Sequence, residues 1–251
     1  MEEKRIMILF EGNIAAGKST VGRRLAESEL FGFVEEPVEF WRHFPLAHGK
    51  EFNLLDWFYE NKGRAAYTFQ TAAFTSRAKN WIEVLAMTDH SQVILERSVF
   101  CDYNVFAFSC FRAGDMKEFE HKLYRGLWSL AIMQGKIDTP DLFVFYDTTS
   151  EECMERMPER ERDEEIKKIQ LAYLREIDVL HKEWLINDDG CAPLILLRDE
   201  FLMGEDPLPE ELEASKIRVP VLLLDGNREW QTSELIEAIQ DKLPATRILL
   251  P

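Results

Sequence analysis

The chain has 251 residues and a formal net charge of −16 at pH 7, with 46% hydrophobic residues. This length suits one α/β domain with a full core, and the acidic balance argues against polymeric nucleic acid as a partner, because such binding needs a basic face. No apolar stretch reaches the roughly 20 residues that span a bilayer, so we expect no membrane partner.

The beginning of the chain and its cysteines bear on localisation. The N-terminus is acidic and enters a predicted strand within five residues, which indicates neither a secretory nor a transit peptide. Cys101, Cys110, Cys153 and Cys191 are far apart and form no C-x-x-C pair. This spacing is typical of reduced thiols, so we expect a cytoplasmic protein.

The first predicted strand, residues 5–10, leads into the run Gly12-Asn13-Ile14-Ala15-Ala16-Gly17-Lys18-Ser19-Thr20. This run fits the phosphate-binding pattern G-x-x-x-x-G-K-[ST], and a helix is predicted to follow over residues 21–30. In such a loop the backbone N–H groups face phosphate oxygens, the lysine reaches the terminal phosphates and the serine hydroxyl can bind Mg²⁺. All nine residues are candidates for binding a nucleoside triphosphate. The alternative is a glycine-containing turn that carries Lys-Ser by chance.

Further apolar runs alternate with helical stretches, the pattern of a parallel sheet with helices on both faces. With the first strand they predict a five-stranded parallel sheet whose other strands are residues 32–36, 92–96, 141–147 and 219–225. The predicted helices are residues 63–87, 115–135, 150–187 with an interruption at Pro158, and 232–243 with a Thr/Ser start signal. We interpret residues 187–216 as a surface excursion within a single domain of residues 1–251.

The helix predicted over residues 115–135 carries one apolar stripe. Its members are Met116, Phe119, Leu123, Leu127 and Leu130. A stripe of this kind is more often internal core than an interface between chains.

Acidic residues are expected next to the phosphate loop, because ligands of open parallel sheets bind at the carboxyl ends of the strands. The second strand ends in Glu35-Glu36 and the third in Glu96-Arg97. One carboxylate could accept a proton from an attacking hydroxyl while the other holds metal-bound water, as a Mg²⁺-dependent phosphoryl transferase requires. Glu36 taken alone could equally be a solvated loop acid.

A second cationic group, Arg156, Arg160 and Arg162, is predicted to form a lid over residues 155–168. Arg156 and Arg160 are one helical turn apart, so they share a face and could close over the terminal phosphate. The alternative is a surface helix whose arginines pair with neighbouring acids.

Together these residues resemble one family, the deoxynucleoside kinases. Besides the phosphate loop, the resemblance rests on six segments in order: Glu36-Pro37-Val38 with Trp41, Thr68-Phe69-Gln70-Thr71, Ser76-Arg77, Glu96-Arg97-Ser98-Val99 with Asp102, residues 156–165, and His181-Lys182-Glu183-Trp184-Leu185. The resemblance implies a P-loop kinase fold and ATP-dependent, Mg²⁺-dependent 5′-phosphorylation of deoxynucleosides in nucleotide salvage. It also implies a homodimer that pairs through helices near residues 115–135.

The resemblance implies a role for individual residues around the reacting atoms. Glu36 would contact the 5′-hydroxyl and take its proton, while Glu96 would lie with Ser19 near Mg²⁺ and is the alternative base. Arg97 would lie between the 5′-oxygen and the phosphates. The other groups that would stabilise the transferred phosphate are Lys18, Arg160 and Arg162.

The resemblance also implies the substrate contacts. Tyr59 and Glu165 would hydrogen-bond the sugar 3′-hydroxyl, and Gln70 would read the base edge. The base slot would be lined by Trp41, Phe69 and Phe106, with Ala73, Arg77 and Asp102 at its floor. On the donor side, the adenine loop would be Arg228, Glu229 and Trp230, with Arg156 and Arg160 at the phosphates.

Ala73, Arg77 and Asp102 match the residues that deoxycytidine and deoxyguanosine kinases carry at these positions. An Arg–Asp pair suits an exocyclic amine and a ring nitrogen, and it leaves little room for a thymine methyl group. We therefore expect deoxyadenosine, deoxyguanosine or deoxycytidine in preference to thymidine. The alternative is that Arg77 and Asp102 form only a buried ion pair.

Two other functions are compatible with the fold. A thymidylate-type nucleoside-monophosphate kinase shares the loop, but Glu35 and Glu36 would repel the second phosphate that its acceptor carries. A catalytically silent structural subunit is the non-enzyme alternative, and the intact set of Lys18, Glu36, Glu96 and Arg97 argues against it.

Overall fold

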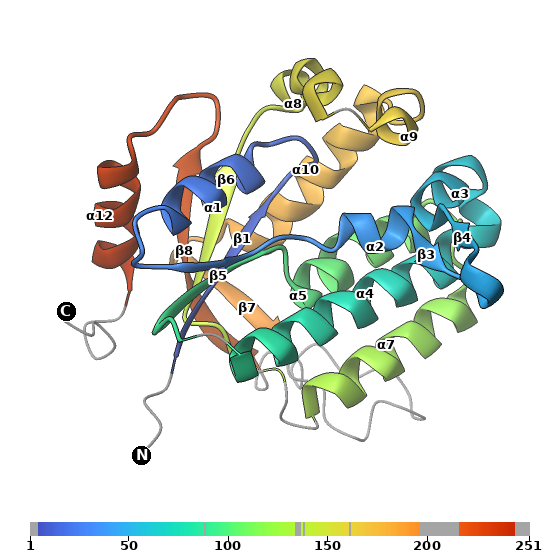
Figure 1. Cartoon of the computed structure of the whole chain (residues 1–251), viewed down its shortest axis with the longest axis horizontal. Coiled ribbons are helices and arrows are strands. Elements are labelled where there is room, and N and C mark those ends of the chain that lie inside the picture. Colours follow the sequence, from blue (N-terminus) through green and yellow to red (C-terminus); the bar gives the residue numbers. More distant parts are fainter. Residues whose placement is uncertain are drawn as a thin grey trace.

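The computed structural model describes residues 5–87, 89–133, 137, 139–160, 162–195 and 216–243. Its centre is a six-stranded sheet in the order β2-β5-β1-β6-β8-β7 (Figure 1). Five of the strands are parallel, and β7 pairs antiparallel to β8 at one edge. The strands are β1 Ile6–Gly12, β2 Gly32–Val34, β5 Gln92–Glu96, β6 Leu142–Asp147, β7 Cys191–Ile195 and β8 Lys216–Asp225.

The strands at the centre of the sheet are apolar along nearly their whole length. All seven residues of β1 are buried, and Ile8 pairs in register with Ile94 of β5 on one side and with Leu142 of β6 on the other. Continuous burial of this kind is what a parallel sheet covered on both faces requires. The predicted set of five parallel strands is therefore confirmed.

Helices and short turns connect the strands. The helices are α1 Lys18–Ala26, α2 Val38–Arg42, α3 Leu54–Glu60, α4 Lys62–Met87, α5 Val99–Cys101, α6 Phe108–Arg112, α7 Glu118–Met133, α8 Ser150–Arg156, α9 Asp163–Ile166, α10 Leu171–Leu185 and α12 Thr232–Lys242. The remaining elements are the short helices η1 Ala47–Gly49, η2 Asp102–Ala107 and η3 Met157–Arg160, and the hairpin strands β3 Phe44–Pro45 and β4 Glu51–Phe52. None of the helices in the described ranges is both long and apolar enough to cross a membrane.

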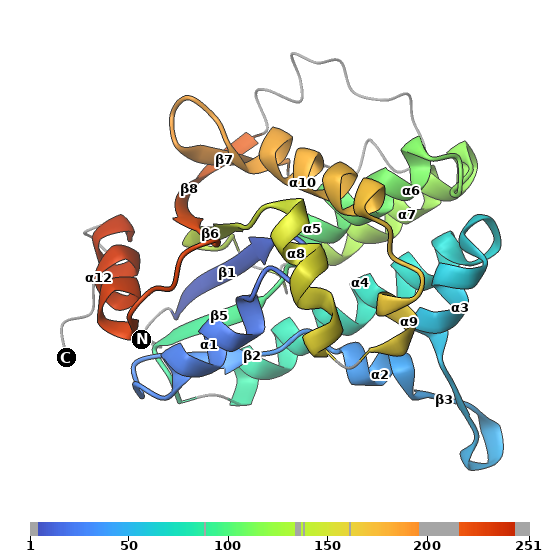
Figure 2. The same ribbon diagram turned by 90° about the horizontal axis from the view of Figure 1, so that it is seen from above.

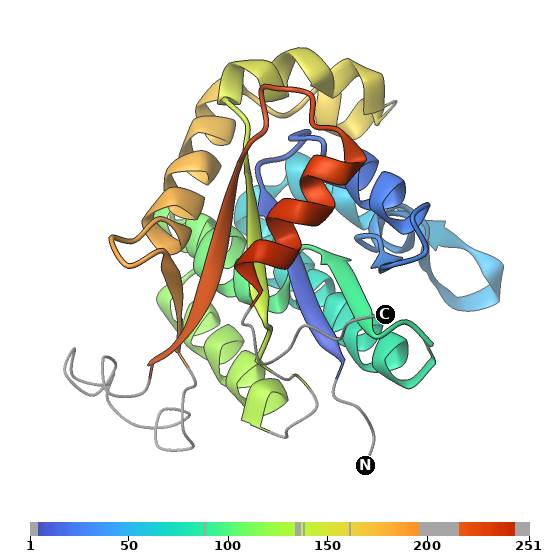
Figure 3. The same cartoon turned by 90° about the vertical axis from the view of Figure 1, so that its left-hand side faces the viewer.

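The two faces of the sheet carry different helices (Figures 2 and 3). Helices α1 and α12 contact each other, α1 packs on β1 and β5, and α12 packs on β8. On the other face, Phe143 of β6 contacts Trp184 of α10 and Phe100 of α5. Phe100 in turn contacts Trp81 of α4 and Trp128 of α7, so an aromatic cluster joins these helices to the sheet.

Several element boundaries differ from the prediction. Helix α1 begins at Lys18, inside the phosphate loop, and α12 is capped by Gln231 through a capping box with Glu234. The helix predicted over residues 150–187 is divided into α8, η3, α9 and α10, with Pro158 inside η3. Part of the predicted surface excursion, residues 191–195, forms the edge strand β7, and residues 196–215 lie outside the described ranges.

Candidate active site

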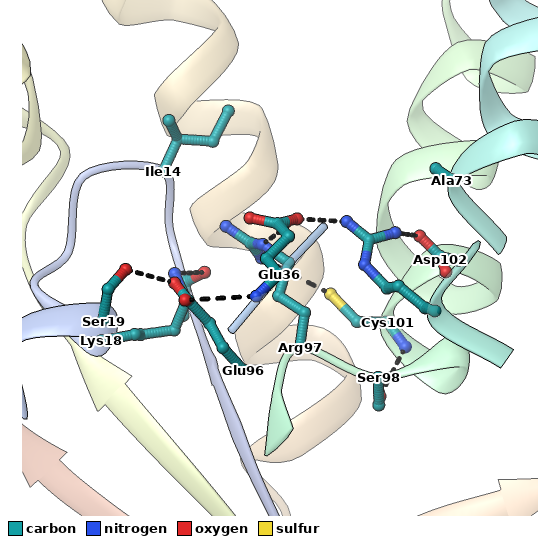
Figure 4. Close-up of polar contacts among 12 residues, drawn as sticks. Ile14, Lys18, Ser19, Glu36, Ala73, Glu96, Arg97, Ser98, Cys101 and Asp102 are labelled. Atoms are coloured by element: carbon teal, nitrogen blue, oxygen red, sulfur yellow. Dashed lines mark hydrogen bonds and ion pairs between the residues drawn. The ribbon is translucent and has the colours of Figure 1, made fainter. Parts of the chain in front are cut away.

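The carboxyl ends of the five parallel strands lie at one edge of the sheet, which gathers the motifs into one place. The phosphate loop follows β1, Glu35 and Glu36 follow β2, and Arg97 follows β5. Figure 4 shows that side chains from these three strand ends point toward one another. Residues that lie tens of positions apart in the sequence therefore form one site.

Glycine is required at two positions of the phosphate loop. Gly12 has a φ of 146°, and a Cβ atom there would lie 2.6 Å from the backbone oxygen of Tyr146 on β6. Gly17 has a φ of 100°, a left-handed conformation that side chains other than glycine rarely adopt. The loop can therefore approach β6 closely and turn back into α1.

Lys18 is held inside the loop by the backbone. Its Nζ donates hydrogen bonds to the carbonyl oxygens of Asn13 at 2.7 Å and Gly12 at 3.1 Å, and the side chain is almost fully buried. Burial and the nearby Arg97 guanidinium lower the pKa of Lys18 to about 8. The ammonium group therefore lies inside the loop, and it loses its charge as the pH rises through about 8.

Ser19 and Glu96 are in direct contact. The Ser19 hydroxyl donates a 2.7 Å hydrogen bond to Glu96 Oε1, and the backbone N–H of Glu36 lies 3.5 Å from Glu96 Oε2 (Figure 4). A hydroxyl and a carboxylate are the oxygen donors that Mg²⁺ prefers in nucleotide sites. The donor set therefore fits this metal.

Glu36 lies between two arginines. It forms an ion pair with Arg77, which also pairs with Asp102, and its Oε1 lies 3.2 Å from Nε of Arg97 (Figure 4). Burial alone would raise the pKa of Glu36, but Arg77, Arg97 and Lys18 together lower it to about 2. The carboxylate is therefore ionised at neutral pH.

Two cavities meet at this carboxylate. The first has a volume of about 330 Å³ and is lined by the phosphate loop together with Arg23, Glu36, Glu96, Arg97, Arg156, Glu159, Arg160 and Arg162. The second is lined by Ile14, Glu36, Val38, Trp41, Leu55, Phe58, Tyr59, Phe69, Gln70, Ala73, Arg77, Arg97, Phe106, Arg160, Glu165 and Tyr173. Glu36, Arg97 and Arg160 line both. A group bound in the phosphate pocket would therefore face a molecule bound in the second cavity across these three side chains.

The second cavity, which we call the acceptor cavity, is narrow and aromatic. Phe69 stacks on Phe58 with ring centroids 4.5 Å apart and meets the edge of Trp41 at 5.5 Å. The Arg77 guanidinium lies 4.9 Å from the Trp41 ring, and that of Arg97 lies 4.7 Å from Phe106. The free volume is about 40 Å³, room for only a few water molecules, so a ligand must widen the cavity to enter.

The predicted lid closes this cavity through ion pairs. Glu165 is buried and lies 3.3 Å from Arg160 and 3.4 Å from Arg162. Glu164 receives a 2.7 Å hydrogen bond from Arg42 on α2. The arginines do pair with neighbouring acids, as the alternative expects, but Arg156, Arg160 and Arg162 also line the phosphate pocket.

The loop after β8 joins the phosphate loop through Arg156, whose Nη1 donates to the carbonyl oxygens of Ala16 and Gly226. In this loop the Arg228 guanidinium stacks on the Trp230 ring at 3.5 Å, and Glu229 is exposed. None of the three predicted adenine-loop residues lines the phosphate pocket, whose described wall ends at Arg156 on this side.

Some cavity residues were not predicted, and one predicted residue lies deeper than expected. Leu55, Phe58 and Tyr173 line the acceptor cavity although no local pattern in the sequence singled them out, and Val38, named in the sequence only as part of the segment Glu36-Pro37-Val38, lines it too. Their common signal is only that each belongs to a helix that the fold brings to the cavity. Asp102 is fully buried behind Arg77 and does not itself line the cavity.

A phosphate loop, acids on neighbouring strands and a lid rich in arginine define a kinase of the P-loop class. The model of the deoxynucleoside kinase family matches residues 8–244. The chain is 32% identical to deoxycytidine kinase 2 of Gallus gallus over 93% of this chain and 87% of that protein. It is 37% identical to the probable deoxycytidine kinase FPV151 of Fowlpox virus over 71% of each chain, and 34% identical to the mitochondrial deoxyguanosine kinase of Xenopus laevis over 74% of each. The chain therefore belongs to the deoxynucleoside kinase family.

Proposed function

We propose that this kinase transfers the γ-phosphoryl group of ATP to the 5′-hydroxyl of a deoxynucleoside in nucleotide salvage. The observation that carries the proposal is that Glu36, Arg97 and Arg160 line both the phosphate pocket and the acceptor cavity. The acceptor oxygen and the terminal phosphate would meet there. The named relatives, which are deoxycytidine and deoxyguanosine kinases, support the same reaction.

In the proposed mechanism Glu36 orients the 5′-hydroxyl and accepts its proton as the oxygen attacks phosphorus. Lys18 and the lid residues Arg160 and Arg162 neutralise the charge that spreads over the phosphoryl oxygens. Arg97 bridges Glu36 and the phosphates. Ser19 and Glu96 would hold Mg²⁺, which would supply further neutralisation of the triphosphate, and Glu96 would then be a metal ligand while Glu36 would serve as the base.

The donor nucleotide is proposed to lie along the phosphate loop, with its adenine at Arg228, Glu229 and Trp230. In the acceptor cavity, Tyr59 and Glu165 would hold the 3′-hydroxyl. Both line the cavity, and burial together with the Glu165 charge raises the pKa of Tyr59, so this phenol remains a hydrogen-bond donor.

The base would lie among Trp41, Phe69 and Phe106, against Gln70. Gln70 Oε1 is buried without a hydrogen-bond partner in the described ranges, so it is available to accept from a base N–H. Beneath it, Ala73 leaves space and Arg77 would donate to a ring nitrogen, while Asp102, which lies behind Arg77, would accept from an exocyclic amine once the bound base has widened the cavity. We therefore propose deoxyadenosine, deoxyguanosine or deoxycytidine as preferred substrates over thymidine.

Pairing into a homodimer and a cytoplasmic location complete the proposal. On α7, Phe119, Leu123, Leu127 and Leu130 are between 41% and 65% exposed, so the stripe is not internal core there. Only Met116 of the predicted stripe is buried.

The four cysteines are free, which supports a reducing compartment.

The test is ATP-dependent phosphorylation of the four natural deoxynucleosides, each assayed separately with Mg²⁺ present. The proposal predicts product from at least one of the three amine-bearing deoxynucleosides, with kcat/KM above that for thymidine. If none of the four is phosphorylated, the proposed reaction is wrong. If thymidine is the best substrate, the assignment of the base slot is wrong.

A further inference from the structure

The backbone at Arg97 has an uncommon conformation. Its φ is 64°, in the left-handed region that a residue with a long side chain rarely adopts. The N–H of Arg97 donates a 2.9 Å hydrogen bond to the carbonyl oxygen of Phe10 on β1, and Ser98 caps the short helix α5 that follows. Such a conformation persists only where the surrounding structure holds it, and it is concentrated at functional sites.

The side chain of Arg97 has three kinds of support. Its Nε faces Glu36 at 3.2 Å, its Nη1 donates to Cys101 Sγ at 3.7 Å, and its guanidinium lies over the Phe106 ring. Glu36 and Phe106 both line the acceptor cavity, whereas Cys101 is fully buried behind it. Cys101 Sγ therefore contacts Arg97 on the side that faces away from the acceptor cavity.

The carbonyl oxygen of Ile177 sets the direction of the hydrogen bonds beyond the sulfur. His181 Nδ1 lies 2.7 Å from the carbonyl oxygen of Ile177, and because a carbonyl can only accept, Nδ1 carries the proton. Burial and the Arg97 charge lower the pKa of His181 well below its usual value, so the ring is neutral and Nε2 is an acceptor. Cys101 Sγ lies 3.4 Å from Nε2, whereas neither carboxyl oxygen of the neighbouring Glu11 has a hydrogen-bond partner in the described ranges, so the S–H donates to Nε2. The lone pairs of the sulfur remain available to accept the hydrogen bond from Arg97.

The imidazole is itself fixed on both sides by rings. His181 stacks on Phe145 of β6 with an interplanar angle of 6° and a centroid distance of 5.8 Å, and it meets the edge of Phe106 at 6.2 Å. Phe106 thus contacts both His181 and Arg97. A continuous chain of contacts runs from the backbone of α10, through His181 and Cys101, to Arg97.

The same residues also resemble a metal site, because ligand atoms of Glu11, Cys101 and His181 lie within 4.8 Å of one another. Two features favour the hydrogen-bonded arrangement. Burial raises the pKa of Glu11 to about 7, which makes it a poor ligand, and Arg97 and the Lys18 ammonium both act electrostatically on it, so a divalent cation would be repelled by two positive charges. Burial raises the pKa of the Cys101 thiol well above its usual value, so the sulfur keeps its proton.

We infer that Cys101 and His181 are positioning residues of this kinase, which hold the Arg97 guanidinium in the orientation that bridges Glu36 and the phosphate pocket. The inference rests on the proposed phosphoryl transfer. Neither residue lines the phosphate pocket or the acceptor cavity. Both act through Arg97, so their loss is expected to lower kcat more than it raises KM.

The kinetic test compares Cys101→Ala with Cys101→Ser and with the control Val93→Ala. Serine keeps both a donor and an acceptor, whereas alanine leaves Arg97 and His181 without their shared partner. Val93 is fully buried at the start of β5, away from the catalytic edge, so its truncation tests loss of packing alone. We expect Cys101→Ala to lower kcat about tenfold or more, with KM for both substrates within about threefold of the wild type. Cys101→Ser and Val93→Ala should stay within about threefold in kcat.

His181→Phe removes the acceptor but keeps a ring that can stack on Phe145. Because both residues act through Arg97, the double variant with Cys101→Ala should lose no more activity than the worse single variant. Equal kcat values for Cys101→Ala and Val93→Ala would overturn the inference, and so would stoichiometric zinc in the purified protein.

A second measurement does not depend on activity. Nitrogen-15 NMR of histidine-labelled protein, with the His181 signals assigned by their loss in His181→Phe, should show a neutral ring protonated at Nδ1 from pH 6 to 8. In Cys101→Ala the Nε2 resonance should shift because its donor is gone. Protonation at Nε2 would overturn the inference even if the wild type phosphorylated no deoxynucleoside, whereas failure of phosphorylation alone would overturn only the proposed reaction.

Discussion

Glu36 combines an ionised state with a position at the junction of the two cavities. A carboxylate with a pKa of about 2 is a weak base toward an alcohol. The loose transition state of phosphoryl transfer needs little proton abstraction before the bond to phosphorus forms, so orientation of the hydroxyl is the larger part of its task.

Replacing Glu36 with Gln preserves the shape of the side chain and removes the charge. Because a positioned base typically contributes about 10²–10⁴-fold, we expect Glu36→Gln to lower kcat by at least about a hundredfold. The dissociation constant for the deoxynucleoside, measured by calorimetry, should change little. Undiminished turnover would exclude Glu36 as the base and leave Glu96 as the alternative.

Lys18 should set the alkaline limit of ATP use. The charged form binds phosphates, and because its pKa is lowered to about 8, the free enzyme loses this charge as pH rises through 8. We expect kcat/KM for ATP to fall above about pH 8 by up to tenfold per pH unit. Glu36, with a pKa of about 2, should cause no loss between pH 5 and 7.

The control for this alkaline fall in kcat/KM is Lys18→Arg, because the guanidinium of arginine stays charged over the whole pH range of the assay. Its activity is expected to be lower, but its profile should be flat from pH 7 to 9.5. If the wild-type kcat/KM does not fall up to pH 9.5, Lys18 does not set an alkaline limit. If the fall persists unchanged in Lys18→Arg, another group sets it.

At the scale of elements, tertiary hydrogen bonds hold the phosphate loop in place. Asn13 Nδ2 donates a 2.8 Å hydrogen bond to the carbonyl oxygen of Leu174 on α10, and Thr148 donates to that of Ala16. The loop is thus tied to α10 and to the end of β6. The same α10 carries His181, so one helix supports both the loop and the contacts behind Arg97.

Gly12→Ala tests the close approach of this loop to β6. A Cβ atom would meet the Tyr146 backbone oxygen at 2.6 Å and would also occupy an unfavourable φ. We expect a loss of unfolding free energy of more than about 2 kcal/mol in urea titrations, together with weaker ATP binding.

Gly114→Ala is the matched control for that substitution. Gly114 has a φ of 76°, and a Cβ atom placed there would meet no other atom within 4 Å, so only the backbone conformation is penalised. We expect Gly114→Ala to lower the unfolding free energy by about 1 kcal/mol and to leave ATP binding unchanged. Equal losses of stability in the two variants would mean that the contact with Tyr146 carries no energetic weight.

The elements that the sequence predicted correctly are those with strong local signals. Strands β1, β5 and β6 are continuous apolar runs, and the phosphate loop is a contiguous motif, so neither needs knowledge of the fold. Strand β7 is short and contains Pro193, which argues against a strand except at a sheet edge, the position it in fact occupies. The cavity contacts of Phe58 and Tyr173 depend on how α3 and α10 pack, which no local pattern encodes.

At the scale of the whole molecule, the surface of α7 is the feature that a lone chain does not explain. The exposed stripe of Leu127 and Leu130 continues into an apolar hollow against α4, lined also by Phe74, Ile82 and Ile137. An apolar surface of this kind is typical of an interface between chains. The hollow shares α4 with the acceptor cavity, so dimerisation would restrict the movement of a helix that lines that cavity.

Leu127→Glu should therefore weaken the proposed homodimer, because it buries a charge without a partner. Sedimentation velocity should show a dimer for the wild type and a monomer for the variant at micromolar concentration. Val179→Glu is the control, since Val179 is similarly exposed on α10, away from the stripe. A wild-type monomer would contradict the homodimer, and so would a Leu127→Glu variant that stays dimeric.

The proposed reaction depends most on an uncharged sugar hydroxyl entering the cavity beyond Glu36. The direct measurement is transfer of labelled γ-phosphate from ATP to a deoxynucleoside and, in a parallel reaction, to its 5′-monophosphate. We predict label on the 5′-oxygen of the deoxynucleoside and none in the diphosphate. Efficient labelling of the monophosphate, with none of the deoxynucleoside, would contradict the proposed reaction.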